Sequence, residues 1–599
     1  MADKRISAII SLCAILLLCF SAFIVITYTK VVTPRKLPNL EGKRIDTALR
    51  GSIFSADGFE ISSSSNIYKA SINTQSIDSE KKELFVNLFS IYSGIAKEEI
   101  LKKFQVKGNV VLSYNLSAST AINLKKLNLV LLRYGVFIEY ENKNGVVIPK
   151  QGLSIEVSGN SRNYRYKGLL EPLVGYVAKQ ENEGITRVYG VKGIEKYYNE
   201  LLNPKQDGEI IGRRDVGFNV IMDKGAVKKT RQDGFDVTLS VILRVQSQLE
   251  TILDNAKTKY NSGEIIAGIM DSKSGQFIAL ASSNRFNPNT LREIKDYSRL
   301  NLSAIERAYE PGSTIKPIIY AVLLEKNKLN PTQNIDLENG NYKLRNYTIR
   351  DSVVLKSATP EGIMLHSSNI GMVKLASVLS SQELHTALKA FGFSQNTGID
   401  LPYEKRGSIP SVKKLNVEQA TKATISYGYG LQSTFMQLLR AYASFSNGGF
   451  LPTPRITSYI TSPSAQRYEP KSYAPLQILS PQIAKEMEEL LIKVVKNGSG
   501  KPAFVENVIV GGKTGTARIA RGGRYVKEYN GSFFGFAKDL EHNYTIGVVV
   551  FESSIENDYY GGRTAAPIFK QIVQMLLKEG YLQPMPNTQE PQSAQNVKE

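Results

Sequence analysis

An uncharged apolar segment from Ile6 to Tyr28 constrains this chain more than any other feature of its sequence. The segment exceeds the roughly 20 apolar residues that a helix needs to cross the hydrocarbon core of a membrane. A cleaved signal peptide has a shorter apolar core and small residues at its cleavage site, whereas the residues after Phe23 are bulky. We therefore expect a retained transmembrane helix over residues 6–28, behind a short N-terminus of residues 1–5. Basic residues flank both ends of the segment, so charge alone does not set its orientation.

Charge and residue usage limit the classes of function. The 599 residues carry a formal net charge of +20, which favours anionic surroundings such as nucleic acid, lipid headgroups or a wall polymer. The sequence contains no zinc-finger spacing, RNA-binding signature or P-loop, so we do not expect nucleic acid as a partner. Both cysteines, Cys13 and Cys19, lie in the apolar segment, which excludes a disulfide framework. With only 3 histidines, neither a zinc site nor a Ser-His-Asp triad is well supplied.

The texture of the chain changes near Gly234. Residues 29–234 mix short apolar runs with charged helical stretches and predict an irregular α+β module, the N-terminal pedestal. Residues 235–250 predict a strand followed by an amphipathic helix. We therefore expect a second domain over residues 235–582, followed by a Pro-, Gln-, Asn- and Ser-rich tail at 583–599 that is predicted to be disordered.

Strands are expected at both ends of this second domain and helices in its middle. Residues 265–270 and 277–281 flank a turn and predict a β-hairpin. Further strands are predicted at 508–510, 532–537 and 544–551. This order indicates an α+β fold in which an antiparallel sheet is covered by helices.

Ser313 and Lys316 form the first element of a candidate catalytic site. They follow the turn residues Glu310-Pro311-Gly312 and precede an apolar run, which predicts a loop that enters a helix. Residues three apart share one face of a helix, about 5–6 Å from each other. The Lys316 amine can therefore serve as the base for the Ser313 hydroxyl. A helix start also directs N–H groups at developing negative charge.

The S-x-x-K pattern is weak by itself, because it also occurs at Ser79–Lys82 and Ser411–Lys414. Two further elements follow Ser313 in order, Ser367-Ser368-Asn369 and Lys513-Thr514-Gly515-Thr516. Together the three elements match the signature of serine β-lactamases and penicillin-binding proteins. Similar triplets precede Ser313, in the wrong order for that signature, at Ser282-Ser283-Asn284 and Lys273-Ser274-Gly275.

Residues 235–570 resemble the transpeptidase domain of class B penicillin-binding proteins. The matching segments are residues 286–289 (FNPN), 309–313 (YEPGS), 397–402 (TGIDLP) and 428–432 (GYGLQ). Near the C-terminus, Tyr560-Gly561-Gly562 and residues 565–569 resemble the type that builds the division septum more than the type that elongates the wall.

The pedestal resembles the same family more loosely. Residues 50–53 (RGSI) with Asp57-Gly58 resemble the opening motif of the family's N-terminal module, and Gly190, Gly193 and Glu195 resemble another of its elements. Ser55 and Ala56 stand where the family usually has an Asp-Arg pair, which leaves open any salt bridge that such a pair makes.

The resemblance implies a peptidoglycan D,D-transpeptidase that also binds penicillin covalently. Ser313 would attack the carbonyl between the two terminal D-alanines of a stem peptide, and Lys316 would take its proton. Ser367 and Lys513 would relay a proton to the departing amine, and Asn369 would orient the substrate.

The third element has its own implied roles. The N–H groups of Ser313 and Thr516 would form the oxyanion hole. The hydroxyls of Thr514 and Thr516 would hold the substrate carboxylate, and Gly515 would let the strand approach closely. Such enzymes require no metal or organic cofactor.

The same resemblance implies a location and partners. The expected location is the bacterial inner membrane, with a short cytoplasmic N-terminus of residues 1–5, a single pass and a periplasmic catalytic domain. The expected partners are stem peptides ending in D-Ala-D-Ala, β-lactam antibiotics, a membrane glycan polymerase and division proteins.

Four alternatives stay open or are weakened by the sequence. An elongation-type transpeptidase shares all three motifs. A D,D-carboxypeptidase or β-lactamase would pass the acyl group to water, and we identify no water-activating glutamate. A non-catalytic division scaffold does not need the intact motif set. A bifunctional synthase needs a glycosyltransferase domain, of which the pedestal carries no signature.

Overall fold

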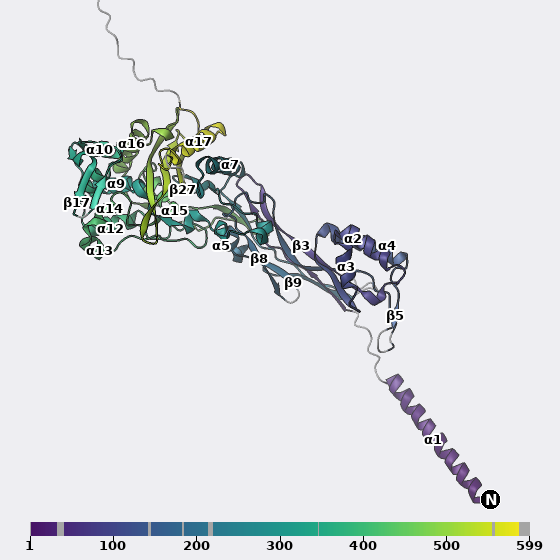
Figure 1. Cartoon of the computed structure of the whole chain (residues 1–599). Coiled ribbons are helices and arrows are strands. Elements are labelled where there is room, and N and C mark those ends of the chain that lie inside the picture. Colours follow the sequence, from purple (N-terminus) through teal and green to yellow (C-terminus); the bar gives the residue numbers. More distant parts are fainter. Residues whose placement is uncertain are drawn as a thin grey trace, which may run out of the picture. The chain divides into compact units, whose positions relative to one another are not determined.

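The computed structural model describes residues 2–585, apart from 33–40, 142–144, 146, 183–184, 214–219, 346, 472 and 554–557. The chain divides into two compact units. One combines Met1–Ala48 with Gln206–Gln232, and the other combines Leu49–Lys205 with Asp233–Glu599 (Figure 1). The tail that we predicted to be disordered lies outside the described residues from position 586 onward.

The apolar segment forms helix α1 (Ala2–Val32), which extends beyond the predicted span at both ends. Among the described residues this is the one helix that is long and apolar enough, by length and composition, to cross a membrane. The hydroxyls of Ser21, Thr27 and Thr29 donate to backbone carbonyls one turn earlier, at 2.7 to 2.9 Å. These bonds satisfy polar groups that lipid cannot satisfy.

The rest of the first unit is a small antiparallel sheet. Its strand order is β1 (Glu41–Asp46), β10 (Gly208–Arg213) and β11 (Val227–Lys229). The Ala48 N–H donates to the Asp207 carboxylate at 2.9 Å. This bond connects the two chain segments that form the unit.

A nine-stranded sheet in the second unit joins segments from both sides of the boundary predicted at residue 234. Strand β12 (Asp236–Leu239) pairs in parallel with β2 (Ile53–Phe54) and antiparallel with β22 (Thr457–Thr461). The remaining strands are β3 (Glu60–Asn73), β4 (Asn109–Leu116), β7 (Ser154–Tyr164), β8 (Val177–Asn182), β9 (Ile185–Gly190) and β23 (Arg467–Tyr468). The predicted domain limits stay a prediction. This sheet continues across the predicted boundary between the pedestal and the second domain.

Helices of the pedestal pack on part of this sheet. They are α2 (Lys82–Ser93), α3 (Lys97–Lys103), α4 (Ala118–Arg133), α5 (Gly193–Tyr197) and α6 (Asn199–Leu202). Phe85 and Phe89 of α2 are fully buried, with ring centroids 5.8 Å apart. They belong to an apolar core that includes Leu124 of α4 and Ile72 of β3, which fixes these helices against the strands.

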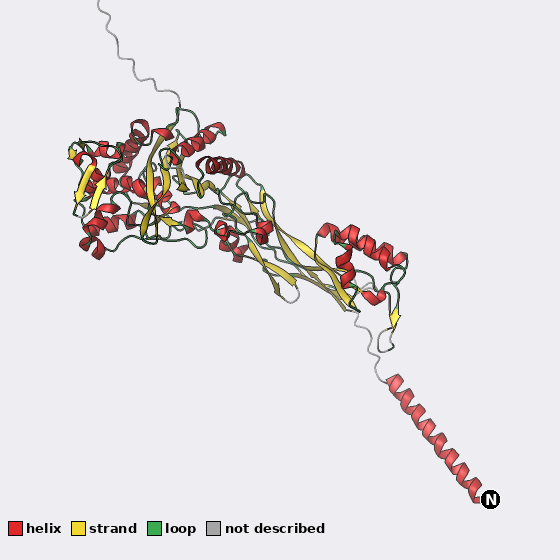
Figure 2. Ribbon diagram, in the orientation of Figure 1, coloured by secondary structure: helices red, strands yellow, loops and turns green. Residues whose placement is uncertain are grey.

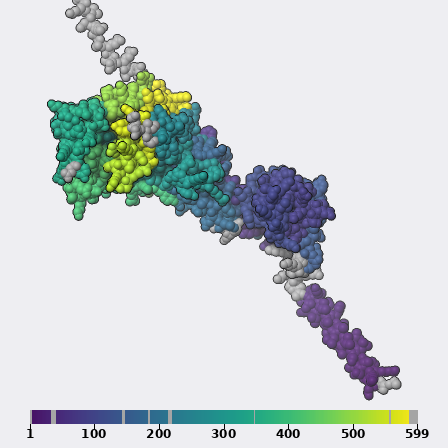
Figure 3. All heavy atoms as spheres, in the orientation of Figure 1, coloured from purple at the N-terminus to yellow at the C-terminus, as the bar shows by residue number. Residues whose placement is uncertain are grey.

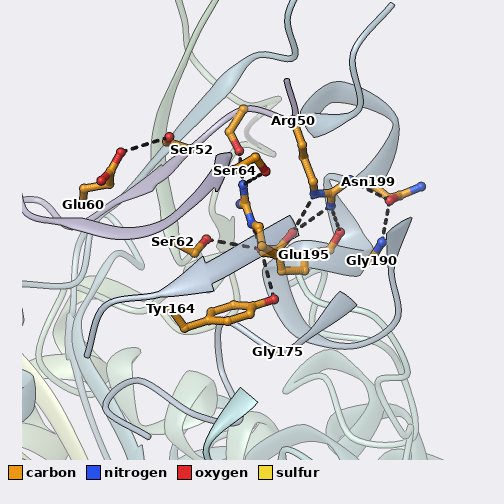
Figure 4. Close-up of polar contacts among 12 residues, drawn as sticks. Arg50, Ser52, Glu60, Ser62, Ser64, Tyr164, Gly175, Gly190, Glu195 and Asn199 are labelled. Carbon is orange, nitrogen blue, oxygen red and sulfur yellow. Dashed lines mark hydrogen bonds and ion pairs between the residues drawn. The ribbon is translucent and has the colours of Figure 1, made fainter. Parts of the chain in front are cut away.

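Two segments of the pedestal that resemble family motifs meet at a buried ion cluster (Figure 4). The guanidinium of Arg50 donates to the Glu195 carboxylate at 2.8 and 2.9 Å, and Arg162 donates to it at 2.6 Å. The Ser62 hydroxyl also donates to it, at 3.2 Å. Burial alone raises the pKa of Glu195, but the two guanidiniums outweigh burial and lower it. The cluster therefore holds Glu195 as a carboxylate.

The positions where the family usually has an Asp-Arg pair form a turn instead. The Phe59 N–H donates to the Ser55 hydroxyl at 3.1 Å, and the Ala56 N–H donates to the Val241 carbonyl at 2.9 Å. Asp57 in turn accepts from the Leu243 N–H at 3.0 Å, at the start of helix α7 (Leu243–Tyr260). Hydrogen bonds, and not an ion pair between residues 55 and 56, thus stabilise this turn.

A five-stranded antiparallel sheet carries the third predicted motif. Its order is β14 (Phe277–Ser282), β13 (Glu264–Asp271), β27 (Asn543–Ser553), β26 (Arg524–Lys538) and β25 (Ile509–Arg521). The predicted hairpin is confirmed as β13–β14. Strands β25 and β26 run well beyond the predicted ranges 508–510 and 532–537, because they continue as a paired ribbon to the turn at Gly522-Gly523.

Both faces of this sheet are buried, since successive side chains of a strand point to opposite faces. Phe533 and Val548 face α7 (Leu243–Tyr260) and α17 (Ala565–Lys578). Phe534 and Val549 face the other side, which is covered by α15 (Phe435–Ala443). Helices flank these strands in Figure 2, and in Figure 3 the yellow-green residues near 510–550 reach the surface between teal and green segments of the same unit.

A mostly helical segment separates the two ends of the sheet, as predicted. Its helices are α8 (Ser303–Glu306), α9 (Lys316–Glu325), α10 (Pro360–Leu365), α11 (Asn369–Ala376), α12 (Ser381–Ala390), α13 (Val412–Val417), α14 (Gln419–Ile425), α15 and α16 (Pro481–Asn497). Short strand pairs lie between them, including β15 (Ala308–Tyr309) with β20 (Ser433–Thr434) and β17 (Asn341–Leu344) with β18 (Tyr347–Arg350). Helix α16 packs on β25 and on α9. It therefore holds the edge strand of the sheet and the helix after Ser313 in one packed unit.

Candidate active site

Ser313 lies in a 3-10 turn, Gly312–Ile315, directly before α9. Gly312 has φ +58° and donates its N–H to the Gly428 carbonyl at 3.1 Å. A hydrogen bond from the protein interior also holds the turn, because the buried Tyr442 hydroxyl donates to the Thr314 carbonyl at 2.7 Å. Ser313 is half-buried, so its hydroxyl is within reach of a substrate. The prediction of a loop entering a helix at this position is confirmed.

Lys316 is the first residue of α9 and is fully buried. Its ammonium nitrogen donates to the Ser367 carbonyl at 2.5 Å and to Asn369 Oδ1 at 2.8 Å, and it lies 3.3 Å from the Ser367 hydroxyl. Burial lowers the pKa of Lys316 well below its usual value, the charge of Lys513 lowers it further, and Asp351 opposes both effects. Lys316 therefore has the depressed pKa that a lysine base requires.

Lys513 approaches the same hydroxyl from β25. Its amine donates to the Ser367 hydroxyl at 2.8 Å and to the Ser499 hydroxyl at 3.3 Å. The side chain is fully buried, and burial lowers the pKa of Lys513 to about 7. The Ser367 hydroxyl thus joins two buried amines, which is the arrangement that a proton relay needs.

Ser367 is held in a strained backbone conformation between α10 and α11. Its φ is +57°, a left-handed value that costs a non-glycine residue about 1–3 kcal/mol and is common at active sites. The Ser367 N–H donates to the Met364 carbonyl at 3.3 Å. This conformation turns both the carbonyl and the hydroxyl of Ser367 toward the amines.

Asn369 begins α11, and its side chain is fixed at both ends. Its Oδ1 accepts from Lys316, and its amide nitrogen donates to the Arg350 carbonyl at 2.9 Å. Ser368 is the N-cap of the helix, with its hydroxyl accepting from the Gly371 N–H at 2.8 Å. The first and second sequence motifs are therefore connected directly, through Lys316 and Asn369.

Asp351 is a positioning residue that the sequence analysis missed. Its carboxylate accepts from the Ser368 hydroxyl and the Asn369 N–H, both at 2.5 Å, and from the Ile370 N–H at 3.1 Å. A carboxylate at a helix N-terminus is stabilised by free N–H groups and by the helix dipole. Asp351 follows β18 and matches no motif, so only the fold reveals that it orients Asn369.

The third motif lies on β25, the edge strand of the sheet. A Cβ on Gly515 would lie 2.4 Å from the Ser532 hydroxyl and 2.8 Å from Thr314 Cγ2, so only glycine fits there. The Thr514 hydroxyl lies 3.4 Å from the Lys513 amine. The Thr516 hydroxyl accepts from the Gly561 N–H at 3.0 Å, which brings the Tyr560-Gly561-Gly562 segment against the motif.

The alternative motif matches have structural explanations. Ser411 is the N-cap of α13, and its hydroxyl accepts from the Lys414 N–H at 3.3 Å. Ser282 donates to the Glu264 carboxylate at 2.7 Å. Lys273-Ser274-Gly275 forms the turn between β13 and β14. Ser79 is exposed in the turn before α2.

The chain matches known families over most of its length. Residues 265–574 match the model of the penicillin binding protein transpeptidase domain, and residues 45–239 match the penicillin-binding protein dimerisation domain. Stage V sporulation protein D of Bacillus subtilis is 31% identical over 71% of this chain and 65% of its own length. Peptidoglycan D,D-transpeptidase FtsI of Escherichia coli K12 is 29% identical over 67% of this chain and 66% of its own length. These matches span slightly less than two thirds of either relative.

Solved structures share the fold. Penicillin binding protein 2X of Streptococcus thermophilus aligns with a TM-score of 0.72 at 22% identity, over 89% of this chain and 80% of that one. A peptidoglycan synthetase of Bifidobacterium adolescentis aligns with a TM-score of 0.68 at 22% identity, over 92% and 98% of the two chains. The predicted fold class, an α+β domain with a helix-covered antiparallel sheet on an N-terminal pedestal, is confirmed.

Proposed function

Because the chain belongs to the penicillin-binding protein transpeptidase family, we propose that it is a peptidoglycan D,D-transpeptidase acting through an acyl-enzyme on Ser313. The observation that carries the proposal is the pair of buried amines, Lys316 and Lys513, that meet at the Ser367 hydroxyl, with Lys316 three residues after the nucleophile Ser313. Burial lowers the pKa of both amines, so a neutral base is available without histidine.

In the first step, Ser313 Oγ attacks the carbonyl between the two terminal D-alanines while its proton passes to Lys316. The carbon–nitrogen bond then breaks, and an ester to Ser313 forms. The leaving D-alanine amine takes a proton that is relayed from Lys513 through the Ser367 hydroxyl. Asn369 keeps the Lys316 amine in place throughout, since it accepts from it at 2.8 Å.

The edge position of β25 supports substrate binding. Among the described strands, none pairs with its outer backbone groups, so an extended stem peptide can add to this edge. The N–H groups of Ser313 and Thr516 stabilise the oxyanion, and the hydroxyls of Thr514 and Thr516 hold the terminal carboxylate. Gly515 keeps the strand close to the nucleophile turn, because any side chain there meets Thr314.

Labelled penicillin tests this assignment, since a β-lactam resembles the D-Ala-D-Ala ending and should acylate the same serine. The wild-type protein should carry the label on Ser313, and Ser313→Ala should fold and fail to label. Ser79→Ala is a matched control, because Ser79 has the same S-x-x-K spacing and is exposed in a turn. An adduct mapped to any residue other than Ser313 would remove the basis of the proposal.

We further propose that α1 anchors the chain in the bacterial inner membrane by a single pass, with the catalytic domain in the periplasm. The proposed segments are those predicted from the sequence. They are a cytoplasmic N-terminus (1–5), a transmembrane helix (6–28), the pedestal (29–234), the catalytic domain (235–582) and a C-terminal tail (583–599). Protease added to intact spheroplasts should degrade the catalytic domain. Protection of that domain until the membrane is lysed would overturn this topology.

The site of action that we propose is the division septum, with a membrane glycan polymerase and division proteins as partners. The segment around Gly561 that resembles the septal type packs against Thr516, and FtsI enzymes are among the similar proteins. Depletion in a rod-shaped host should give filaments with blocked septa. Rounded cells that still divide would instead indicate an elongation role.

A further inference from the structure

Glu310 places beside the nucleophile a carboxylate that the proposed acylation step does not use. It directly follows strand β15 and lies three residues before Ser313. Three residues of chain span at most about 10 Å, and the turn at Gly312, with φ +58°, shortens that separation. One peptide-sized substrate can therefore contact both Glu310 and Ser313.

Two neutral donors hold the Glu310 carboxylate. The Gly430 N–H donates to it at 2.8 Å, and the Tyr525 hydroxyl donates to it at 3.1 Å. The side chain is half-buried, and burial raises the pKa of Glu310 although both hydrogen bonds oppose the rise. Glu310 is thus oriented, and it is a stronger base than an ordinary surface glutamate.

Among the residues that the structure describes, no lysine or arginine forms an ion pair with Glu310. Other partly or fully buried glutamates nearby do have a cation. Glu306 pairs with Lys192 at 2.7 Å, and Glu264 pairs with Arg307 at 3.4 Å. Glu310 therefore offers its negative charge to a molecule that enters from solvent.

Tyr525, which donates to this carboxylate, belongs to a cluster of three tyrosine rings. The rings of Tyr429 and Tyr525 meet edge to face with centroids 5.6 Å apart, and Tyr427 lies 5.7 Å from Tyr429. The Tyr429 hydroxyl accepts from the Arg518 N–H at 3.1 Å, two residues beyond the third motif on β25. Aromatic faces attract cations, so the rings and the Glu310 carboxylate together favour an ammonium group.

The second half of the proposed reaction needs such a group. The acceptor is the amine of another stem peptide, and an amine with a lysine-like pKa of about 10.4 arrives as an ammonium. Lys316 and Lys513 are themselves amines and repel this charge in their protonated forms. Asp351 accepts from three donors at the start of α11, so its carboxylate is already engaged.

We propose that Glu310 is the acceptor-amine residue, which binds the primary ammonium of the incoming stem peptide and takes one of its protons. This inference rests on the proposed transpeptidase function and adds the group that its second step recognises. The resulting neutral amine attacks the ester carbonyl, and the bond from that carbon to Ser313 Oγ breaks. A second proton of the amine returns to Ser313 Oγ through Lys316, the third stays on the new amide, and Glu310 releases its proton to water.

The partition of one acyl-enzyme between two acceptors tests the role of Glu310. The full-length protein in detergent is acylated by a thioester of an N-acyl-D-alanine, and chromatography measures the ratio of transfer to hydrolysis. One acceptor is Nα-acetyl-lysine amide, an ammonium at neutral pH, and the other is hydroxylamine, which is largely uncharged there. Because both products come from the same acyl-enzyme, the ratio does not depend on the acylation rate or on the folded fraction.

In Glu310→Gln, the transfer ratio to the lysine derivative should fall at least ~10-fold, and the ratio to hydroxylamine should stay within ~2-fold, given general-base effects of ~10²-fold or more. Glu489→Gln is the matched control, because Glu489 is exposed on α16, and it should change neither ratio. Equal ratios in Glu310→Gln and wild type, or an equal fall for both acceptors, would overturn the assignment of Glu310.

A wild-type protein that neither the thioester nor penicillin acylates would instead refute the proposed function itself, so the two failures are distinguishable. If Glu310→Gln does not fold, Tyr525→Phe decides the question, because it removes one hydrogen bond to the Glu310 carboxylate. It should lower transfer to the lysine derivative by about 10-fold and spare hydroxylamine, as expected for a hydrogen bond to a charged group. A variant without this selectivity overturns the proposal.

Discussion

Lys513 should make the fold less stable at neutral pH, and replacing it by methionine should reveal how much. Methionine keeps an unbranched chain of similar length in the fully buried site and removes the titrating amine. The variant loses the hydrogen bonds from the amine to the hydroxyls of Ser367 at 2.8 Å and Ser499 at 3.3 Å and to the Thr514 carbonyl at 3.2 Å. It also loses the cost of burying a cation.

The pKa of Lys513 sets the size of this effect. A lysine ordinarily titrates near 10.5, and burial lowers the pKa of Lys513 to about 7. The cost is fully present below the folded value and disappears above the unfolded one, so stability rises with pH between them. At about 1.4 kcal/mol per pKa unit, the cost is about 4 kcal/mol at pH 7 and about 2 kcal/mol at pH 9. The three lost hydrogen bonds offset about 1 kcal/mol each.

Lys513→Met should therefore be more stable than wild type by about 1 kcal/mol at pH 7 and less stable by about 1 kcal/mol at pH 9. Urea unfolding of the full-length protein, followed by circular dichroism because the chain has no tryptophan, measures this difference. Lys485→Met is the matched control, since Lys485 is exposed on α16, and it should change stability at neither pH. The charge of Lys513 also lowers the pKa of Lys316, so the difference between the two proteins includes the loss of that repulsion, which stabilises the variant in the same direction.

A variant that is less stable than wild type at pH 7 would contradict this reasoning, as would a stability difference that is equal at both pH values. Either result would mean that Lys513 keeps its charge through additional stabilisation. The same variant should acylate penicillin more slowly, because the relay through Ser367 has lost its terminal amine.

Three further outcomes follow from the geometry. Lys316→Arg keeps a permanent charge and should slow penicillin acylation by at least the ~10²-fold typical of general-base removal; a near wild-type rate would show that Lys316 only positions the serine. Asp351→Asn removes a charge that raises the pKa of Lys316, so the rise of the acylation rate with pH should move to lower pH; an unmoved profile would contradict this coupling. Glu195→Gln leaves Arg50 and Arg162 buried without a carboxylate and should cost about 3–5 kcal/mol of unfolding free energy; a small loss in urea unfolding would show that solvent reaches the cluster.

Local patterns predicted several parts of this protein well. The run of uncharged apolar residues predicted α1, and the alternation of apolar runs and turns predicted the β13–β14 hairpin. The residues around Ser313 predicted the turn and the helix that follows. These features depend on residues close in sequence, where periodicity and turn chemistry act directly.

Strands β25 and β26 are longer than the sequence patterns predicted, because cross-strand pairing extends them. Residues 517–530 of β25 and β26 mix four basic residues with scattered apolar ones around a Gly-Gly turn, so they contain no long apolar run. They form strands because each pairs with the facing strand, as Arg518 does with Tyr529 and Arg521 with Arg524. A pattern search along the chain does not detect such a ribbon, since its stability comes from cross-strand contacts.

The sequence by itself determined which residues carry the proposed chemistry: Ser313, Lys316, Ser367, Asn369 and Lys513 were all named from motif order. Only the tertiary structure decided what surrounds them. It brought Asp351 to the start of α11 and set Glu310 between Gly430 and Tyr525, residues more than a hundred positions further along the chain. Burial and charge set the pKa of each group, and both depend on contacts between segments distant in sequence. A motif can name an amine or a carboxylate, but only the packed fold determines its charge and its hydrogen-bond partners.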